Sequence, residues 1–206
     1  MPLYKRILHK EQTQILIWHI TESLELLSDG IDLNEDSLNR LSSMHSEIHQ
    51  KGFLSVRQLL KILGYRDADL FYTKDGKPHL KDGKRISITH SFEFSGIIVS
   101  DFAVGIDIEK NREKIIKIAP KFLADEFNFV DVQNQIEFLT VIWGAKESLY
   151  KIHPDGGLRF KEHLPIEPFK LEDGKTKGWI KKGKYYEKFC IFFEILQGYT
   201  MVYAVN

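Results

Sequence analysis

Apolar residues recur every three to four positions through the first third of the chain, which is the period of an amphipathic helix. The pattern predicts three helices, over residues 11–28, residues 38–50 and residues 53–63. The second is expected to end just before Gly52. Gly64 is placed to end the third, because glycine readily adopts the left-handed conformation found after a helix.

Beyond residue 70 the pattern changes to an alternation of apolar and polar positions, the period of a β-strand. Turn-forming Asp-Gly pairs occur at residues 75–76 and 82–83. Three short strands are predicted, over residues 86–90, 96–100 and 103–109. The first half of the chain is thus predicted as helices followed by strands.

The second half repeats that order. A helix is predicted over residues 115–127, with Pro120 in its first turn, and a longer helix over residues 136–151 ends near Pro154. Two halves with the same order predict an α+β protein built from two similar subdomains, residues 1–103 and 104–206. The strands expected after the long helix lie around Phe160 and over residues 166–171, 179–181, 189–196 and 199–205.

The composition is that of a globular protein without a global charge. Apolar residues make up 43% of the 206 positions, enough for a proper core. Lysine plus arginine and aspartate plus glutamate number 29 each, so no overall field recruits nucleic acid or an anionic membrane. The single cysteine, Cys190, excludes an internal disulfide and a cysteine-cluster metal site. Without a signal-peptide core or the ~18 apolar residues of a membrane span, the chain is expected to be soluble and cytoplasmic.

The strand predicted around residues 104–109 carries the first candidate chemistry. Its apolar positions alternate with Gly105, Asp107 and Glu109, so the two carboxylates project from one face, about 7 Å apart. An acidic pair on an otherwise apolar strand is costly to bury unless a positive group lies beside it. This pair therefore indicates a cation site; the alternative is an ordinary polar strand face.

The long helix carries a second candidate group. Trp143, Glu147 and Lys151 are spaced four residues apart and therefore share one face. Taken alone, Glu147 and Lys151 are best explained as an exposed helix ion pair, which contributes only a few tenths of a kcal/mol.

Four earlier residues could bind phosphate. Thr89 and His90 end a strand, where a hydroxyl and an imidazole can donate to phosphate oxygens. Lys77 follows a turn and would supply a cation at a fixed position. Arg57 lies on the polar face of a predicted helix. Each has a plain structural alternative: a surface histidine, a simple turn or a solvated charge.

In chain order these motifs resemble the 4′-phosphopantetheinyl transferases, specifically the surfactin-synthetase-activating type, in which two similar halves form one chain. The family signature is Gly-(Ile/Val)-Asp and, after a long gap, an aromatic residue, Lys-Glu and a lysine four positions after the glutamate. The matching residues are Gly105-Ile106-Asp107 and Trp143, Lys146, Glu147 and Lys151; Gly76-Lys77-Pro78 and Thr89-His90-Ser91 match as well.

The resemblance implies a magnesium site formed by Asp107, Glu109 and Glu147. These ligands do not distinguish magnesium from manganese. Coenzyme A is the implied substrate. Its phosphates would be held by Lys77, Thr89, His90 and Lys151, with Arg57 at the nucleotide's phosphate end.

By the same resemblance, the hydroxyl of a serine on an apo acyl or peptidyl carrier protein attacks the β-phosphate, and adenosine 3′,5′-bisphosphate leaves. Glu147 is the implied general base, directly or through a metal-bound water, and Lys151 neutralises charge on the leaving phosphate. The family places this site in the cleft of a pseudo-dimeric monomer. Fatty-acid, polyketide and nonribosomal-peptide carriers all remain open.

Three alternatives stand beside this interpretation. A catalytically silent relative would bind coenzyme A or a carrier without transfer. Another magnesium-dependent phosphotransferase would need its own phosphate cradle, and the sequence has no Walker-type glycine loop. A purely structural interaction module would use neither the acidic strand nor the helix motif for chemistry.

Overall fold

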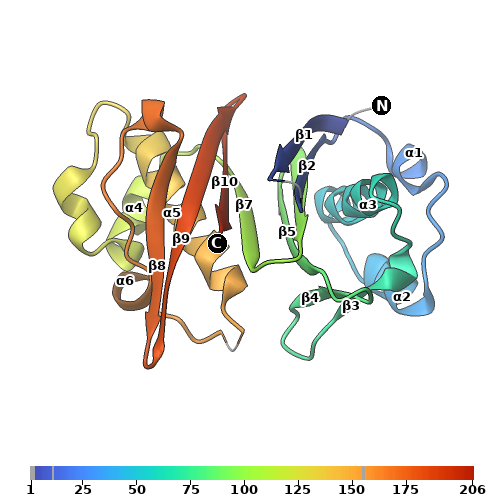
Figure 1. The fold of residues 1–206 in the computed structure, drawn as a ribbon. Coiled ribbons are helices and arrows are strands. Elements are labelled where there is room, and N and C mark those ends of the chain that lie inside the picture. Colours follow the sequence, from blue (N-terminus) through green and yellow to red (C-terminus); the bar gives the residue numbers. More distant parts are fainter. Residues whose placement is uncertain (1–2, 11, 155) are drawn as a thin grey trace. The chain divides into compact units, whose positions relative to one another are not determined.

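The computed structural model describes residues 3–10, 12–154 and 156–206 (Figure 1). By its internal contacts the chain forms two compact units, Met1–Phe102 and Ala103–Asn206. Each unit combines an antiparallel sheet with helices, which confirms the predicted α+β class. No helix in the described part of the chain is long and apolar enough to cross a membrane.

The first unit has a four-stranded sheet in the order β1-β2-β6-β5, with all neighbours antiparallel. Helix α3 packs against β2, β5 and β6. A small ribbon, β3 with β4, adjoins β5. The elements are β1 (Leu3–His9), β2 (Thr13–His19), α1 (Leu24–Ser28), α2 (Glu35–Ser42), α3 (Glu47–Ile62), the 3₁₀ helix η1 (Asp67–Asp69), β3 (Leu70–Tyr72), β4 (Pro78–Leu80), β5 (Arg85–Ser91) and β6 (Phe94–Ser100).

The helix predicted over residues 11–28 is wrong. Residues Thr13–His19 form strand β2, and only Leu24–Ser28 are helical. Ile15, Leu16 and Ile17 are consecutive and fully buried, as expected of a central strand paired on both sides rather than of one helix face. Residue 11, part of that prediction, lies outside the described residues.

The next two predicted helices exist with different bounds. Helix α3 runs without a break from Glu47 to Ile62, so the predicted end before Gly52 is wrong. The helical conformation is interrupted earlier, between the end of α2 at Ser42 and Ser46, the N-cap of α3. Gly64 follows α3 with φ of +85°, as predicted for a helix end.

The second unit has a four-stranded antiparallel sheet in the order β7-β10-β9-β8. Helix α5 packs on this sheet, chiefly on β7 and β10, and α4 packs on α5. The elements are β7 (Val104–Lys110), α4 (Lys114–Phe122), the 3₁₀ helix η2 (Asp125–Phe129), α5 (Gln135–Ile152), α6 (Phe160–His163), the 3₁₀ helix η3 (Leu171–Asp173), β8 (Lys175–Lys182), β9 (Tyr185–Leu196) and β10 (Tyr199–Val205).

Three local predictions in this unit are wrong. The segment at Phe160 begins the short helix α6, not a strand, and its ring packs against that of Trp143, with 5.3 Å between centroids. Ile166 makes a single bridge to Gly178 instead of starting a strand. Pro120 lies in the last turn of α4, because the helix begins at Lys114. At Phe160 and Ile166, a contact with a residue distant in sequence overrides the local pattern. At Pro120, the reason is that the helix begins at Lys114.

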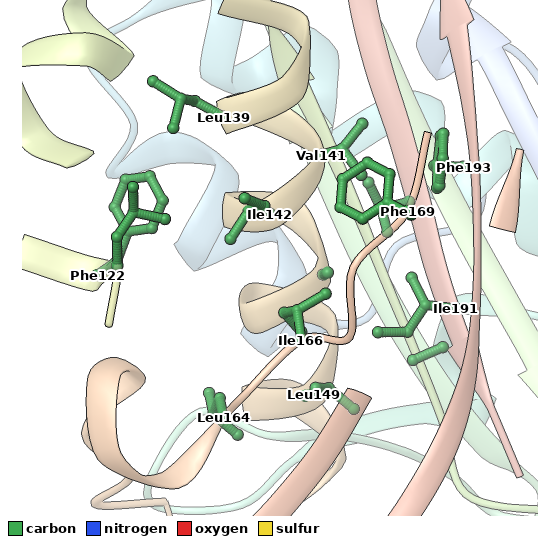
Figure 2. Packing of buried hydrophobic residues seen from close by; sticks show 14 of the residues in the cluster. Phe122, Leu139, Val141, Ile142, Leu149, Leu164, Ile166, Phe169, Ile191 and Phe193 are labelled. Carbon is green, nitrogen blue, oxygen red and sulfur yellow. The ribbon is translucent and has the colours of Figure 1, made fainter. Parts of the chain in front are cut away.

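A hydrophobic cluster in the second unit holds α5 in place (Figure 2). Phe138 of α5 stacks on Phe169 with 4.3 Å between ring centroids, and Phe169 also contacts Phe193 of β9. Because α5 carries half of the candidate site, this packing fixes where its polar side chains lie. The labelled members are Phe122, Leu139, Val141, Ile142, Leu149, Leu164, Ile166, Phe169, Ile191 and Phe193.

Each unit contains a strand, a long helix and then a β-hairpin whose last strand lies beside the first. In the first unit these are β2, α3, β5 and β6, and in the second β7, α5, β9 and β10. The predicted order, helices and then strands, therefore misses the opening strand of the first unit. The opening strand of the second unit, β7, was predicted over residues 103–109. That the two units form a pseudo-dimer with a site in the cleft between them stays a prediction.

Candidate active site

The site in the second unit depends on an unusually close contact between β7 and α5. A Cβ atom at Gly105 would lie 2.0 Å from the backbone oxygen of Ser148, so strand and helix touch there through their backbones. A Cβ at Gly144 would lie 2.7 Å from Cγ2 of Val202 and 3.6 Å from Oδ2 of Asp107. The two glycines bring the acidic face of β7 directly against the polar positions of α5.

Asp107 and Lys151 form an ion pair across this contact. The Lys151 Nζ lies 2.8 Å from Oδ1 of Asp107 and donates to the backbone oxygen of Ile106, also at 2.8 Å. Asp107 is buried, with 5% of its surface exposed, while Lys151 is partly exposed. The ammonium is therefore fixed beside the strand with one side still open to solvent.

Glu109 extends the acidic face along β7. Its Oε1 accepts a hydrogen bond from Nε1 of Trp143, at 3.1 Å. Burial raises the pKa of Glu109, and the charge of Asp107 raises it further. The Trp143 hydrogen bond and the charges of Lys151 and Arg112 act in the opposite direction.

Glu147, on α5, has a carboxyl group with a large pKa shift. Burial, and then the charge of Asp107, raise the pKa of Glu147 to about 7; Lys151 opposes this shift and Glu109 adds to it. Three carboxylates thus share one region of low dielectric with one ammonium facing them. The local excess of negative charge favours an additional cation.

The chemistry of the donor set fits a hard divalent cation. Magnesium takes a few carboxylate oxygens together with waters and substrate phosphates, and manganese accepts the same ligands. Within residues 3–10, 12–154 and 156–206, no three acidic, histidine or cysteine side chains are gathered closely enough to hold a metal. Asp107 instead directs Oδ1 to Lys151. The three carboxylates therefore interact electrostatically without converging on one point.

A groove of about 890 Å³ within the second unit borders one of these carboxylates. Glu147 lines it, and Trp143, Tyr150 and Phe160 supply aromatic surface. A smaller hollow of about 190 Å³ adjoins Glu109. The remaining lining residues of the larger groove are Lys114, Ile118, Lys121, Phe122, Arg159, Lys161 and Glu162.

Two of the predicted phosphate-binding residues occur together in the first unit. Thr89 is buried near the end of β5, and the next residue, His90, is exposed. The His90 ring meets that of His49 edge to face, 5.8 Å between centroids. Lys77 lies in the turn between β3 and β4, where its N–H donates to Oγ1 of Thr73 at 3.1 Å.

Arg57 has the contacts of a structural residue. Only 4% of its surface is exposed. Its Nε donates to Oδ1 of Asp67 at 3.0 Å, and its guanidinium lies 3.5 Å from the ring centroid of Phe53. The arginine thus joins α3 to η1, and its charge faces Asp67 rather than solvent.

The part of the chain that holds the acidic site is similar to a known protein family. The family model described as the 4′-phosphopantetheinyl transferase superfamily matches residues 103–203, from the residue before β7 well into β10. Over these residues the chain is similar to this superfamily. The match includes Asp107, Glu109, Glu147 and Lys151.

A curated member of the superfamily gives a longer match. The 4′-phosphopantetheinyl transferase gsp of Aneurinibacillus migulanus is 29% identical over 157 residues. These cover 72% of this chain and 64% of that protein, so the chain spans less than two thirds of its curated relative. A match of this length extends beyond the second unit, which has 104 residues, into the first.

One signature residue of the superfamily is buried away from the groove. Lys146 is fully buried, with its Nζ 2.7 Å from Oε1 of Glu126 and 3.1 Å from the backbone oxygen of Phe160. Burial lowers the pKa of Lys146, and the charge of Glu126 opposes that shift. Glu126 also accepts from the backbone N–H groups of Ala124 and Ile166. The pair holds η2 and α6 against α5.

Sequence reasoning did not identify Glu126. A signal was present on the helix itself, because Leu139, Ile142, Lys146 and Leu149 follow one another at helical spacing. A lysine in an apolar row needs a buried acidic partner. Which acid serves depends on how residues 123–130 fold back, and the local pattern does not contain that information.

Proposed function

We propose that this protein transfers the 4′-phosphopantetheine group of coenzyme A to a serine hydroxyl of an apo acyl or peptidyl carrier protein, with magnesium and with release of adenosine 3′,5′-bisphosphate. The observation that supports this best is the group of Asp107, Glu109, Glu147 and Lys151, placed where β7 touches α5 and beside a groove. The similarity of residues 103–203 to the superfamily supports the same reaction.

Asp107, Glu109 and Glu147 would hold the metal. The bound cation would neutralise diphosphate charge and polarise the phosphorus for attack. Burial, and then repulsion from Asp107, raise the pKa values of Glu109 and Glu147. These shifts support the role, because a cation at this place would stabilise the charged carboxylates against both effects. Lys151 already neutralises part of the charge of Asp107.

Glu147 is the proposed general base. A carboxylate whose pKa is about 7 can accept a proton from a serine hydroxyl near neutral pH, and Glu147 lines the groove from which that hydroxyl would approach. A carboxylate that also binds a metal is a weaker base. We therefore favour proton transfer through an intervening water.

Lys151 would stabilise the charge that develops on the departing α-phosphate. Its ammonium is anchored by Asp107 and by the Ile106 backbone oxygen, so it is already oriented before substrate binds. Preorganisation of this kind costs no further ordering during the reaction.

Lys77, Thr89 and His90, in the first unit, are the proposed phosphate ligands of the nucleotide portion. Arg57 is left out of this set, because its guanidinium is buried against Asp67. The proposal thus assigns nucleotide binding to residues 1–103 and metal binding and chemistry to residues 104–206.

The groove of the second unit would receive the carrier serine and the pantetheine arm. Trp143, Tyr150 and Phe160 offer apolar surface for the arm. Four basic side chains around it favour an acidic partner: Lys114, Lys121, Arg159 and Lys161. The proposal includes a cytoplasmic monomer. Because the chain has no net charge, no overall field would attract nucleic acid or an anionic membrane.

Mass spectrometry of a carrier protein tests the proposal. An apo carrier incubated with the protein, coenzyme A and magnesium should gain the mass of one phosphopantetheine, and chelation of the metal should abolish the gain. Asp107→Ala and Glu147→Ala should abolish it as well. Glu162→Ala is the matched control, since Glu162 lines the groove but contributes nothing to the proposed chemistry.

Two other outcomes would overturn the proposal in different ways. An unmodified carrier with measurable coenzyme A binding would identify a catalytically silent relative. If the carrier stays unmodified and the protein binds no coenzyme A, the protein is an interaction module.

A further inference from the structure

Helix α3 and strand β5 approach each other most closely where Gly52 meets His90. A Cβ atom at Gly52 would lie 2.8 Å from Cδ2 of His90, 3.2 Å from its Cγ and 3.5 Å from its Cβ. These three atoms are the nearest that a side chain at this position would meet, and all belong to one residue. The absent side chain of Gly52 therefore leaves space that the His90 imidazole fills.

The glycine is not required by the backbone. Gly52 lies inside the continuous helix α3, where alanine has a higher helix propensity. It is absent from the glycines with positive φ. Its backbone conformation thus suits any residue, and the proximity of His90 is the physical reason for a glycine.

A second residue borders the same imidazole. The rings of His49 and His90 are 5.8 Å apart and meet at 89°, edge to face. His49 precedes Gly52 by three residues, so both lie on the face of α3 that adjoins the end of β5. One side of the His90 ring therefore lies against helix backbone, while the imidazole as a whole stays exposed.

We propose that Gly52 is a positioning residue for coenzyme A binding: it sets the orientation in which the His90 imidazole is offered to a phosphate group, with His49 as the second border. The inference rests on the proposed function. Gly52 itself touches no substrate and acts only through His90.

The mechanism is steric. A methyl group at residue 52 cannot approach a ring carbon to 2.8 Å, so the imidazole must rotate away. A surface histidine has room to rotate, and the fold should therefore survive while the phosphate loses its donor. A hydrogen bond to a charged phosphate is directional, and its loss weakens binding by about tenfold or more.

A double-mutant cycle on Gly52 and His90 provides the test, with coenzyme A affinity measured by isothermal titration calorimetry. Gly52→Ala and His90→Ala should each weaken binding by about tenfold. The double variant should bind no more weakly than His90→Ala alone, because nothing remains for the new methyl group to displace. His49→Ala should have a smaller effect, and Lys61→Ala, at the far end of α3, should have none.

Kinetics and melting provide readouts that a general loss of structure would not reproduce. Gly52→Ala should raise KM for coenzyme A and leave kcat unchanged. Alanine should raise Tm in the His90→Ala background, through its higher helix propensity, and raise it less or lower it when His90 is present.

Equal weakening by Gly52→Ala with and without His90 would overturn the inference, and so would coenzyme A binding unaffected by Gly52→Ala. If the unmodified protein binds no coenzyme A, the proposed function fails. The melting cycle still decides whether Gly52 and His90 are coupled, and additive Tm changes would then overturn the positioning role.

Discussion

At the scale of single residues, the site depends as much on missing side chains as on charged ones. Gly105 and Gly144 remove two Cβ atoms between α5 and the sheet, and Asp107 reaches the helix face because of that. The glycine in the Gly-Ile-Asp motif therefore has a steric reason. Its presence was predicted from the resemblance, but its role becomes clear only where the helix packs.

We expect Gly105→Ala to destabilise the protein by about 3 kcal/mol, near the upper end for an overpacked core position. The new Cβ would lie 2.0 Å from the Ser148 backbone oxygen, which cannot move without shifting α5. Urea denaturation measures the change. Gly83→Ala is the comparison: its Cβ would meet nothing within 4 Å, and its positive φ of +85° alone should cost about 1 kcal/mol. Equal costs for the two variants would contradict the close contact.

The raised pKa of Glu147 predicts a pH-dependent stability for the protein in EDTA. The carboxyl has a pKa of about 7 in the folded state against 4.5 for its ordinary value, so the folded state holds the proton more tightly. This contribution is fully present below pH 4.5 and is lost as pH rises through 7. Thermal melts from pH 4.5 to 8 should show a loss on the order of 2 kcal/mol.

Glu147→Gln should remove most of that dependence, because glutamine does not titrate. Identical pH profiles for the variant and the unmodified protein would show that Glu147 is not the titrating group. Adding magnesium should reduce the loss at pH 8 if the cation binds beside Glu147.

At the scale of secondary-structure elements, α5 joins the sheet, η2 and α6. One face packs in the apolar cluster, one presents Glu147 and Lys151 to β7 and the groove, and Lys146 reaches Glu126. The helix was predicted well because its apolar positions recur over many turns. The helix predicted across residues 13–19 failed because a short apolar run does not distinguish a central strand from a helix face.

We expect Lys146→Met to destabilise the protein by about 3–5 kcal/mol, since it leaves Glu126 buried without its cation. Adding Glu126→Gln should recover at least half of the loss, because an amide oxygen can still accept one backbone N–H and carries no charge. Chemical denaturation of the two variants measures this. A double variant less stable than Lys146→Met would contradict the assignment of the loss to an uncompensated charge.

At the scale of the whole molecule, the proposed function assigns a different task to each unit. Phosphate binding is assigned to Lys77 and His90 in the first and chemistry to Glu147 in the second. The two units share a strand–helix–hairpin topology, and each has its own hydrophobic cluster. Substitutions at the proposed site residues of the first unit should therefore weaken coenzyme A binding, and those in the second unit should slow the transfer itself.

Lys77→Ala should raise KM for coenzyme A by about tenfold, with transfer restored at saturating coenzyme A, because a phosphate contact is lost without a change in the reacting groups. Glu147→Gln should abolish transfer at every coenzyme A concentration. Initial rates of carrier modification, followed by mass spectrometry, separate the two effects. A lowered kcat for Lys77→Ala would contradict this division.

The sequence by itself determined the α+β class, the long helix, the strands around residues 86–109 and the family to which the motifs belong. These features follow from local geometry: alternation places Asp107 and Glu109 on one face of a strand, and a spacing of four places Glu147 and Lys151 on one face of a helix.

Only the tertiary structure decided which charged side chains are fully buried and which keep an exposed surface. The local sequence does not distinguish Arg57 and Lys146 from Lys77 and Lys151. Yet the side chains of Arg57 and Lys146 are buried in ion pairs, whereas that of Lys151 stays partly exposed beside Asp107. The burial of a charge depends on a partner supplied by another element, and so do the glycine contacts at residues 52 and 105. Such pairings are set when the elements pack, and no local pattern encodes them.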